Sequence, residues 1–172
     1  HETVLQLIYY RWAGLGRQQF IGDFCYKKEP LMKRGGFYDF PLAWGSDDVS
    51  AVMAATESGI ANTEKVCFQY RKNRFSISSD TNNRRKADAL ILQWEWYDKF
   101  FREYKTSNGQ EGMTLALLKE MMPLHFMLYI KETIRKDLCR GKYKVFYWLK
   151  NRTKYKITTE QILFQLVKSL KK

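Results

Sequence analysis

Apolar residues recur at helical spacing at the start of the chain and through most of its second half. A capping-box pattern over residues 3–6 opens the first of these segments, and Gly14 follows it. In the second half, Pro123 interrupts the pattern, and we expect the helix around it to be kinked or broken. The helices predicted in these regions cover residues 4–13, 84–104, 115–138 and a final segment that opens at Thr158.

The rest of the first half has shorter and more varied patterns. Residues 20–26 and 66–71 are rich in β-favouring residues and predict two strands. A short helix is predicted between Pro30 and Gly35, and Ser46 is placed to cap a further helix. These elements indicate a mixture of strands and helices before residue 83.

The two halves differ in charge as well as in pattern. Residues 1–83 contain ten Lys/Arg and nine Asp/Glu, a balance of +1, whereas residues 84–172 contain twenty and nine, a balance of +11. We therefore expect an α/β fold, or α+β for the chain by itself, in which residues 1–83 form the α/β part and residues 84–172 a basic helical extension. The extension either faces an anionic partner or is a solvated basic surface.

Composition narrows the setting of the protein. Hydrophobic residues make up 45% of the 172, so one packed core is expected, and no apolar stretch approaches the length of a membrane span. Three widely spaced cysteines indicate reduced thiols in a cytosolic protein. Two histidines and no paired cysteines do not match a zinc site, and we expect no metal site in this chain itself.

The segment from Gly35 to Asp48 carries the most informative chemistry. A Gly-Gly-Phe turn leads through an aromatic loop to Ser46, and Asp47 and Asp48 then fall in the first turn of the predicted helix. Carboxylates at the positive end of a helix suit a catalytic base. The same pattern also describes a plain helix stop, a serine N-cap and two first-turn acids, so the residues alone leave both interpretations open.

This segment resembles the C-terminal, acceptor-side region of bacterial family 2 glycosyltransferases of the GT-A fold. The acidic pair of that family is usually Glu-Asp, whereas this chain has Asp47-Asp48. The preceding residues 20–28 resemble a strand that lies near the acceptor in those enzymes, and residues 68–78 resemble their Tyr-Arg segment. Three landmarks in the same order give a resemblance over residues 17–80.

The resemblance implies roles for individual residues. Asp48 is expected to be the general base that deprotonates the acceptor hydroxyl in a single inverting displacement, and Asp47 to orient the acceptor or the loop. The arginines among the candidate substrate-binding residues would neutralise the departing diphosphate, and the tryptophan would stack on a sugar. The candidates are Trp44, Tyr70, Arg71 and Arg74.

The resemblance also implies partners that this chain does not hold alone. The donor would be a nucleotide sugar and the acceptor a saccharide or a lipid-linked saccharide, in the synthesis of cell-surface polysaccharide. A divalent metal ion, Mg²⁺ or Mn²⁺, would bind the donor diphosphate through an Asp-x-Asp motif, which the 172 residues lack. We therefore expect the nucleotide-binding half to lie outside them and the isolated chain to be inactive. An unpaired strand edge would favour self-association as a homodimer.

Cations and aromatic residues are mixed over residues 140–156 without a single acid. This composition suits an anionic surface, which places the protein in the cytoplasm with peripheral contact to the inner membrane face, and it suits a solvated basic face equally well. The alternative to the enzyme is a non-enzymatic module that binds an anionic membrane or nucleic acid. For the enzyme itself, no nucleic-acid partner is expected. The candidate anion-binding residues are Lys142, Lys144, Lys150, Arg152 and Lys154.

Overall fold

The described part of the protein is all helical. The computed structural model describes residues 2–15, 24–55, 59–63, 65, 69 and 82–170. These residues form seven α-helices and no sheet, and 72% of them are helical. The nearest approach to a strand pair among them is one antiparallel bridge, in which Glu2 and Ile60 exchange two backbone hydrogen bonds of 2.8 Å. The predicted α/β or α+β fold class is therefore wrong.

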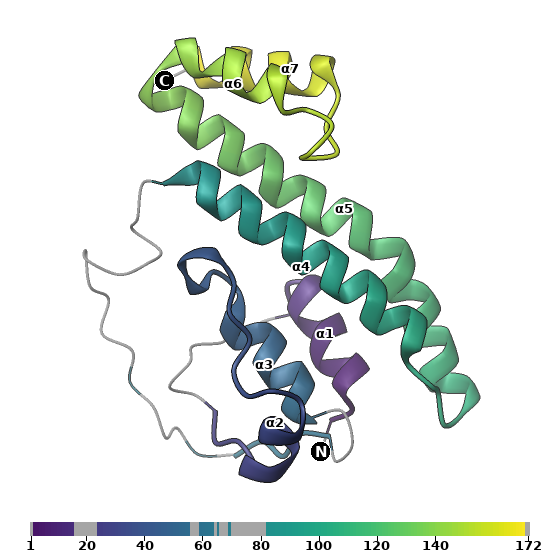
Figure 1. The fold of residues 1–172 in the computed structure, drawn as a ribbon. Helices are drawn as coiled ribbons and strands as arrows, with labels where there is room; N and C mark the ends of the chain where they lie inside the picture. The colour runs from purple at the N-terminus through teal and green to yellow at the C-terminus, as the bar shows by residue number, and fades with distance from the viewer. Residues whose placement is uncertain are drawn as a thin grey trace.

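The helices are arranged around one long antiparallel pair. In Figure 1, α4 and α5 run side by side in opposite directions, α1 lies against this pair with α3 and α2 beyond it, and α6 and α7 pack at the C-terminal end of α5. The α-helices are α1 (Val4–Trp12), α2 (Lys28–Lys33), α3 (Ser46–Ala55), α4 (Asn83–Glu103), α5 (Gly109–Arg140), α6 (Val145–Lys150) and α7 (Thr159–Leu170). Two short 3₁₀ turns are η2 (Pro41–Ala43) and η4 (Lys142–Lys144).

The β-favouring runs do not form a sheet where the structure describes them. The end of the first run, residues 24–27, is irregular backbone, and most of the second run, residues 66–71, lies outside the described residues. A β-favouring side chain needs a pleated surface and a partner strand to fit against. The described ranges supply no partner strand, and the rings of Phe24 and Tyr26 instead pack against each other at 5.6 Å between centroids.

The capping box at the start of α1 is confirmed. The Thr3 hydroxyl accepts a hydrogen bond from the Gln6 backbone N–H at 3.2 Å, and the Gln6 side chain accepts one from the Thr3 N–H at 2.9 Å. The two bonds satisfy backbone donors that a helix start otherwise leaves open. The predicted helices at 84–104 and after Thr158 are also present, as α4 and α7.

The predicted start of α5 at residue 115 is wrong, and the helix is not broken near Pro123. The helix begins at Gly109, where the Asn108 side chain accepts from the Glu111 N–H at 3.0 Å, and it continues unbroken through Pro123. A proline inside a helix removes one hydrogen bond and crowds the preceding turn. Packing of the fully buried residues Leu118, Phe126 and Ile130 holds the helix continuous across this site.

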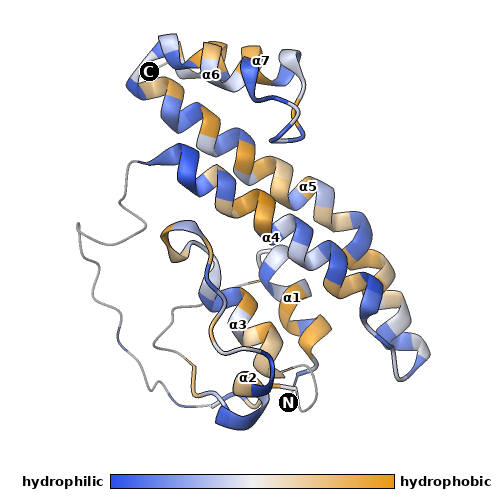
Figure 2. Ribbon diagram, viewed as in Figure 1, coloured by the Kyte–Doolittle hydropathy of each residue, from blue (hydrophilic) through white to orange (hydrophobic). Residues whose placement is uncertain are grey.

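One hydrophobic core joins elements from both halves of the chain. It includes Leu5 of α1, Val52 of α3, Phe101 of α4 and Phe126 of α5. Figure 2 shows apolar residues along α1, α3, α4 and α5, interspersed with polar ones. The core contains residues from both sides of the predicted division at residue 83 and so does not mark a boundary there. The division stays a prediction about chain organisation.

We expect Phe126→Ala to lower the free energy of unfolding by about 3–5 kcal/mol, because it removes a large buried ring and leaves a cavity. Phe126 is 1% exposed and contacts the rings of Trp94, Tyr97 and Trp12. Urea unfolding at neutral pH measures the change. The control, Leu124→Ala on the same helix, removes a side chain that is 64% exposed and should cost less than about 0.5 kcal/mol. Equal losses in the two variants would show that the core is not where the structure places it.

Candidate functional site

A glycine-rich turn directs the chain from α2 into the loop before α3. Gly35 and Gly36 have φ of +94° and +86°, a region that residues with a Cβ rarely adopt. The loop is then fixed to α4, because the Gln93 side-chain amide donates to the Trp44 carbonyl at 2.8 Å. Gly45 lies so close to Gln93 that a Cβ at this position would overlap with its side chain. Gly45 itself has a φ of +80°, so its backbone conformation favours glycine here.

Two serines of α3 hold the loop against the helix start. α3 begins at Ser46 itself, and the Ser46 hydroxyl accepts from the Phe40 backbone N–H at 3.1 Å. The Ser50 hydroxyl accepts from the Tyr38 N–H at 3.0 Å and donates to the Ser46 carbonyl at 2.6 Å. Ser46 thus braces the loop in place of the capping role predicted for it. These hydrogen bonds hold the first turn of α3, which carries Asp47 and Asp48, against the preceding loop.

Asp48 is paired with a residue that the sequence pattern does not reveal. Its Oδ2 accepts a hydrogen bond of 2.8 Å from Nη2 of Arg11, at the end of α1, and its Oδ1 lies 2.6 Å from the same nitrogen. Oδ1 is enclosed and accepts no hydrogen bond of normal geometry from the described residues. The Asp48 side chain is 21% exposed and that of Arg11 is 26% exposed.

Burial makes the Asp48 carboxyl a weaker acid. It raises the pKa of Asp48 from 3.8 to about 6, against the opposing attraction and hydrogen bond of Arg11, and the nearby Asp47 carboxylate raises it further. Two tyrosines share this environment. The pKa of Tyr26 is raised to about 12, chiefly by burial, and that of Tyr97 is raised for the same reason. Asp48 is therefore ionised at neutral pH and becomes protonated in mildly acidic solution.

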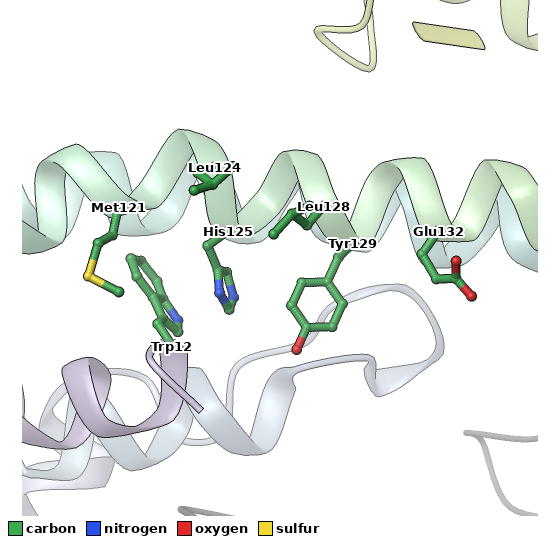
Figure 3. A pocket seen from close by; sticks show the side chains of 7 residues that line it. All are labelled: Trp12, Met121, Leu124, His125, Leu128, Tyr129 and Glu132. Carbon is green, nitrogen blue, oxygen red and sulfur yellow. The ribbon is translucent and has the colours of Figure 1, made fainter. Parts of the chain in front are cut away.

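An apolar cavity of about 390 Å³ lies between Trp12, which follows Arg11 at the end of α1, and the middle of α5; neither Arg11 nor Asp48 lines it. Figure 3 shows the side chains that line it: Trp12, Met121, Leu124, His125, Leu128, Tyr129 and Glu132. The rings of Trp12 and His125 stack with centroids 4.5 Å apart. Burial, aided by the charge of Arg11, lowers the pKa of His125 to about 4, so its ring is neutral at physiological pH.

Of the predicted substrate-binding residues, Trp44 is the one that falls within the described ranges. Trp44 precedes α3, and the Lys86 ammonium lies 4.5 Å from the centre of its ring, so one face of the indole is already covered. The predicted stacking of Trp44 on a sugar stays a prediction, limited to its other face. Tyr70, Arg71 and Arg74 lie outside the described residues.

The predicted anion-binding cations divide into two groups. Lys142 donates to the Ser169 hydroxyl at 2.8 Å, Lys144 to Asp137 at 2.8 Å, and Lys154 lies 2.6 Å from Asp88. These three contacts connect helices within the molecule. The remaining two, Lys150 and Arg152, are exposed.

Sequence reasoning also missed Asp137, a buried acid on α5. Its side chain is 4% exposed and accepts from the Lys144 ammonium and, at 3.1 Å, from the Trp148 indole N–H. Nε of Arg84 lies 3.9 Å from the same carboxylate. Buried carboxylates need such partners. The signal for Asp137 in the sequence was an acid just before the basic segment 140–156.

Comparisons with known proteins give no match: no family model, no curated protein and no solved structure matches this chain. None of the helices in the described ranges is long and apolar enough to cross a membrane. Within the same ranges, no group of three or more His, Cys, Asp and Glu side chains is arranged to hold a metal ion.

We expect the stability difference between the wild type and Asp48→Asn to depend on pH. The folded-state pKa of Asp48 is raised, so the folded protein binds this proton more tightly than the unfolded chain does. The resulting stabilisation is present below about pH 4 and is lost as the pH rises through about 6, which amounts to up to about 3 kcal/mol.

Urea unfolding of both proteins across this range measures the difference. Every other carboxylate is common to the two proteins, so Asp48 alone accounts for it. Relative to the variant, the wild type should lose stability between pH 4 and pH 7. A constant difference, or one that grows in favour of the wild type, would show that the Asp48 carboxyl is not a buried group with a raised pKa.

Proposed function

We propose that the chain is the acceptor-side part of an inverting glycosyltransferase in which Asp48 is the general base. The observation that carries the proposal is the Asp48 carboxylate, which is largely enclosed on the first turn of α3, paired with Arg11 and has a pKa raised to about 6. A group with that pKa is ionised at neutral pH and still basic enough to accept a proton from an attacking hydroxyl. The resemblance of residues 35–48 to family 2 glycosyltransferases supports the same assignment, although residues 24–27, expected in a strand near the acceptor, are irregular backbone.

In the proposed reaction, the acceptor hydroxyl oxygen attacks C1 of the donor sugar as its proton passes to Asp48. The new bond forms between that oxygen and C1, the bond from C1 to the diphosphate oxygen breaks, and the nucleotide diphosphate leaves with its electron pair. Oδ1 of Asp48, which accepts no hydrogen bond of normal geometry, is the oxygen available to the acceptor. Because Arg11 covers it, the Arg11 side chain must shift when the acceptor binds.

The cavity beside Trp12 favours a lipid-linked acceptor over a free saccharide. Its lining is mostly apolar, and the Glu132 carboxylate at its end is already bound by Arg135 through two hydrogen bonds of 2.8 Å and 2.6 Å. A site for a free sugar needs several open polar groups, whereas the apolar portion of a lipid carrier needs few. Such an acceptor places the enzyme in cell-surface polysaccharide synthesis, at the cytoplasmic face of the membrane.

The proposal assigns donor binding to residues outside this chain. A divalent metal ion on the donor diphosphate, which the resemblance implies, finds no ligand set among the described residues and no Asp-x-Asp motif in the sequence. We therefore assign no step through a metal to the described residues. Their part is to hold the acceptor, to keep the Asp48 carboxylate in place and to receive the proton. By itself the 172-residue chain should not turn over a sugar nucleotide.

We expect Asp48→Asn, made in the complete enzyme, to lower kcat by about 10²–10⁴-fold while leaving the affinity for the nucleotide sugar nearly unchanged, because an amide cannot accept the proton. The assay is sugar transfer with Mg²⁺ or Mn²⁺ and a panel of UDP- and GDP-sugars. Asp39→Asn is the matched control, since Asp39 is an exposed acid of the preceding loop. Near-normal turnover in Asp48→Asn, or an equal loss in Asp39→Asn, would remove Asp48 from the mechanism.

We expect Arg11→Ala to move the acid limb of the pH–rate profile upward from about pH 6. Arg11 lowers the pKa of Asp48 through its charge and its hydrogen bond, so without it the carboxyl holds its proton to a higher pH. The profile of kcat/KM against pH, recorded for the wild type and the variant, gives this shift directly. An acid limb that stays in place or moves downward would contradict the pairing of Arg11 with the base.

A further inference from the structure

The last two helices expose an unusual set of apolar side chains. On α7 the set is Leu163, Phe164, Val167 and Leu170; Tyr143 of η4 and Phe146 of α6 add two more, and the exposed fractions run from 45% to 73%. Figure 1 places α6 and α7 together at the C-terminal end of α5, away from α2 and α3. Single exposed apolar residues are common on proteins, but a concentration on one helical unit marks a contact surface.

The exposed set of α7 lies on a helix that is firmly held. Its other side buries Ile162, Gln165 and Ser169, and the Ser169 hydroxyl accepts from the Lys142 ammonium at 2.8 Å. On the outside, Leu163, Val167 and Leu170 recur every three or four residues, which is the spacing of one helix face. Nothing in the described ranges covers this face. The exposed face of α7 therefore belongs to a helix that is packed on its other side, and it does not result from fraying of the chain end.

Charge indicates the kind of partner that covers it. Residues 140–172 contain ten Lys/Arg and one Asp/Glu. Lys144 is used within the molecule, but Lys150, Arg152 and Lys168 are exposed, and the Lys168 ammonium lies 4.8 Å from the centre of the Phe164 ring. A partner of this surface must accept apolar side chains next to negative charge. The interface of an anionic lipid bilayer has both properties.

A nucleic acid satisfies only half of this description. Single strands bind to basic grooves through bases that stack on aromatic rings. The exposed stripe of α7 is mainly aliphatic, because Leu163, Val167 and Leu170 stand beside the single aromatic Phe164. The exposed aromatics Tyr143 and Phe146 suit a base or a membrane interface alike, so the aliphatic stripe decides between the two partners. Aliphatic side chains gain little from a base but are readily buried among acyl chains. The surface therefore matches a membrane better than a polynucleotide.

We propose that α6 and α7 dock the protein on an anionic membrane surface. α7 lies in the plane of the interface, its exposed leucines, Phe164 and Val167 enter the boundary between headgroups and acyl chains, and Lys150 and Lys168 contact the headgroups. The proposal goes beyond the proposed glycosyltransferase activity and does not depend on it, because lipid binding requires neither donor nor base. The two therefore succeed or fail separately.

The test is flotation of the full 172-residue chain with phosphatidylcholine vesicles that do or do not contain phosphatidylserine. We expect binding to the anionic vesicles and little to the neutral ones. The double variant Phe164→Ser/Val167→Ser should lower the partition coefficient by about tenfold or more, because two inserted side chains are lost. Lys150→Ser and Lys168→Ser should each lower it by about fivefold at low salt.

Matched controls make the same changes at the other end of the molecule. Met113→Ser/Leu117→Ser replaces two exposed apolar residues of α5, and Lys119→Ser removes an exposed cation from the same helix. These controls should bind as the wild type does, and circular dichroism shows whether each variant is folded. No binding to anionic vesicles, or equal losses in the α5 controls, would overturn the proposal.

Two further outcomes would also overturn it. If sedimentation shows a dimer that Phe164→Ser/Val167→Ser converts to a monomer, and vesicles are not bound, the face is covered by a second copy of the chain. If a single-stranded oligonucleotide binds where vesicles do not, the basic surface serves nucleic acid.

Discussion

The packing of α4 against α5 fixes the positions of the other described elements. Phe126 of α5 stacks near Trp94 of α4, and Trp12 of α1 meets the same phenylalanine edge-on. The loop before α3 is attached to this pair through Gln93 of α4, and α6 is attached through Asp137 of α5. Tightly packed interiors transmit displacement, so a change at the shared contact moves both the Asp48 carboxylate and the C-terminal helices. The candidate site and the candidate docking surface therefore depend on one core, although they lie at different ends of it.

The Asp48 site combines two opposing demands. Enclosure raises the pKa of the carboxyl and so disfavours the ionised form, while Arg11 favours it. The observed balance, with a pKa of about 6, leaves the carboxylate ionised at neutral pH but less stable than it would be in water. A fold selected for stability alone would place an amide or an apolar residue here. The proposal of Asp48 as a general base rests on this combination of an enclosed carboxylate, a raised pKa and a specific cationic partner.

Local signals in the sequence located α1, α4 and α7 but not the site. The Thr3 capping box and the apolar spacing of α4 and α7 depend on residues three to seven positions apart, and these predictions were confirmed, whereas the start of α5 was missed. The contact between Arg11 and Asp48 joins residues 37 positions apart, and no periodicity reports it. The strand predicted at residues 20–26 is absent where it is described, over residues 24–26, because β-favouring composition specifies a strand only when a partner strand is present. The strand predicted at residues 66–71 stays a prediction. The roles of Tyr70 and both predicted arginines, Arg71 and Arg74, stay predictions.

The basic segment shows why composition alone could not assign its function. Lys144 and Lys150 look equivalent in the sequence, yet Lys144 offsets the buried charge of Asp137 whereas Lys150 is exposed. Removing one partner of a buried pair leaves an uncompensated charge and weakens the fold, while the attraction of an exposed cation to a charged surface is screened by salt. Loss of membrane binding in a Lys144 variant would therefore report unfolding as readily as lost contact. Variants of the exposed cations leave the helices intact, so only these variants can distinguish a loss of membrane binding from a loss of stability.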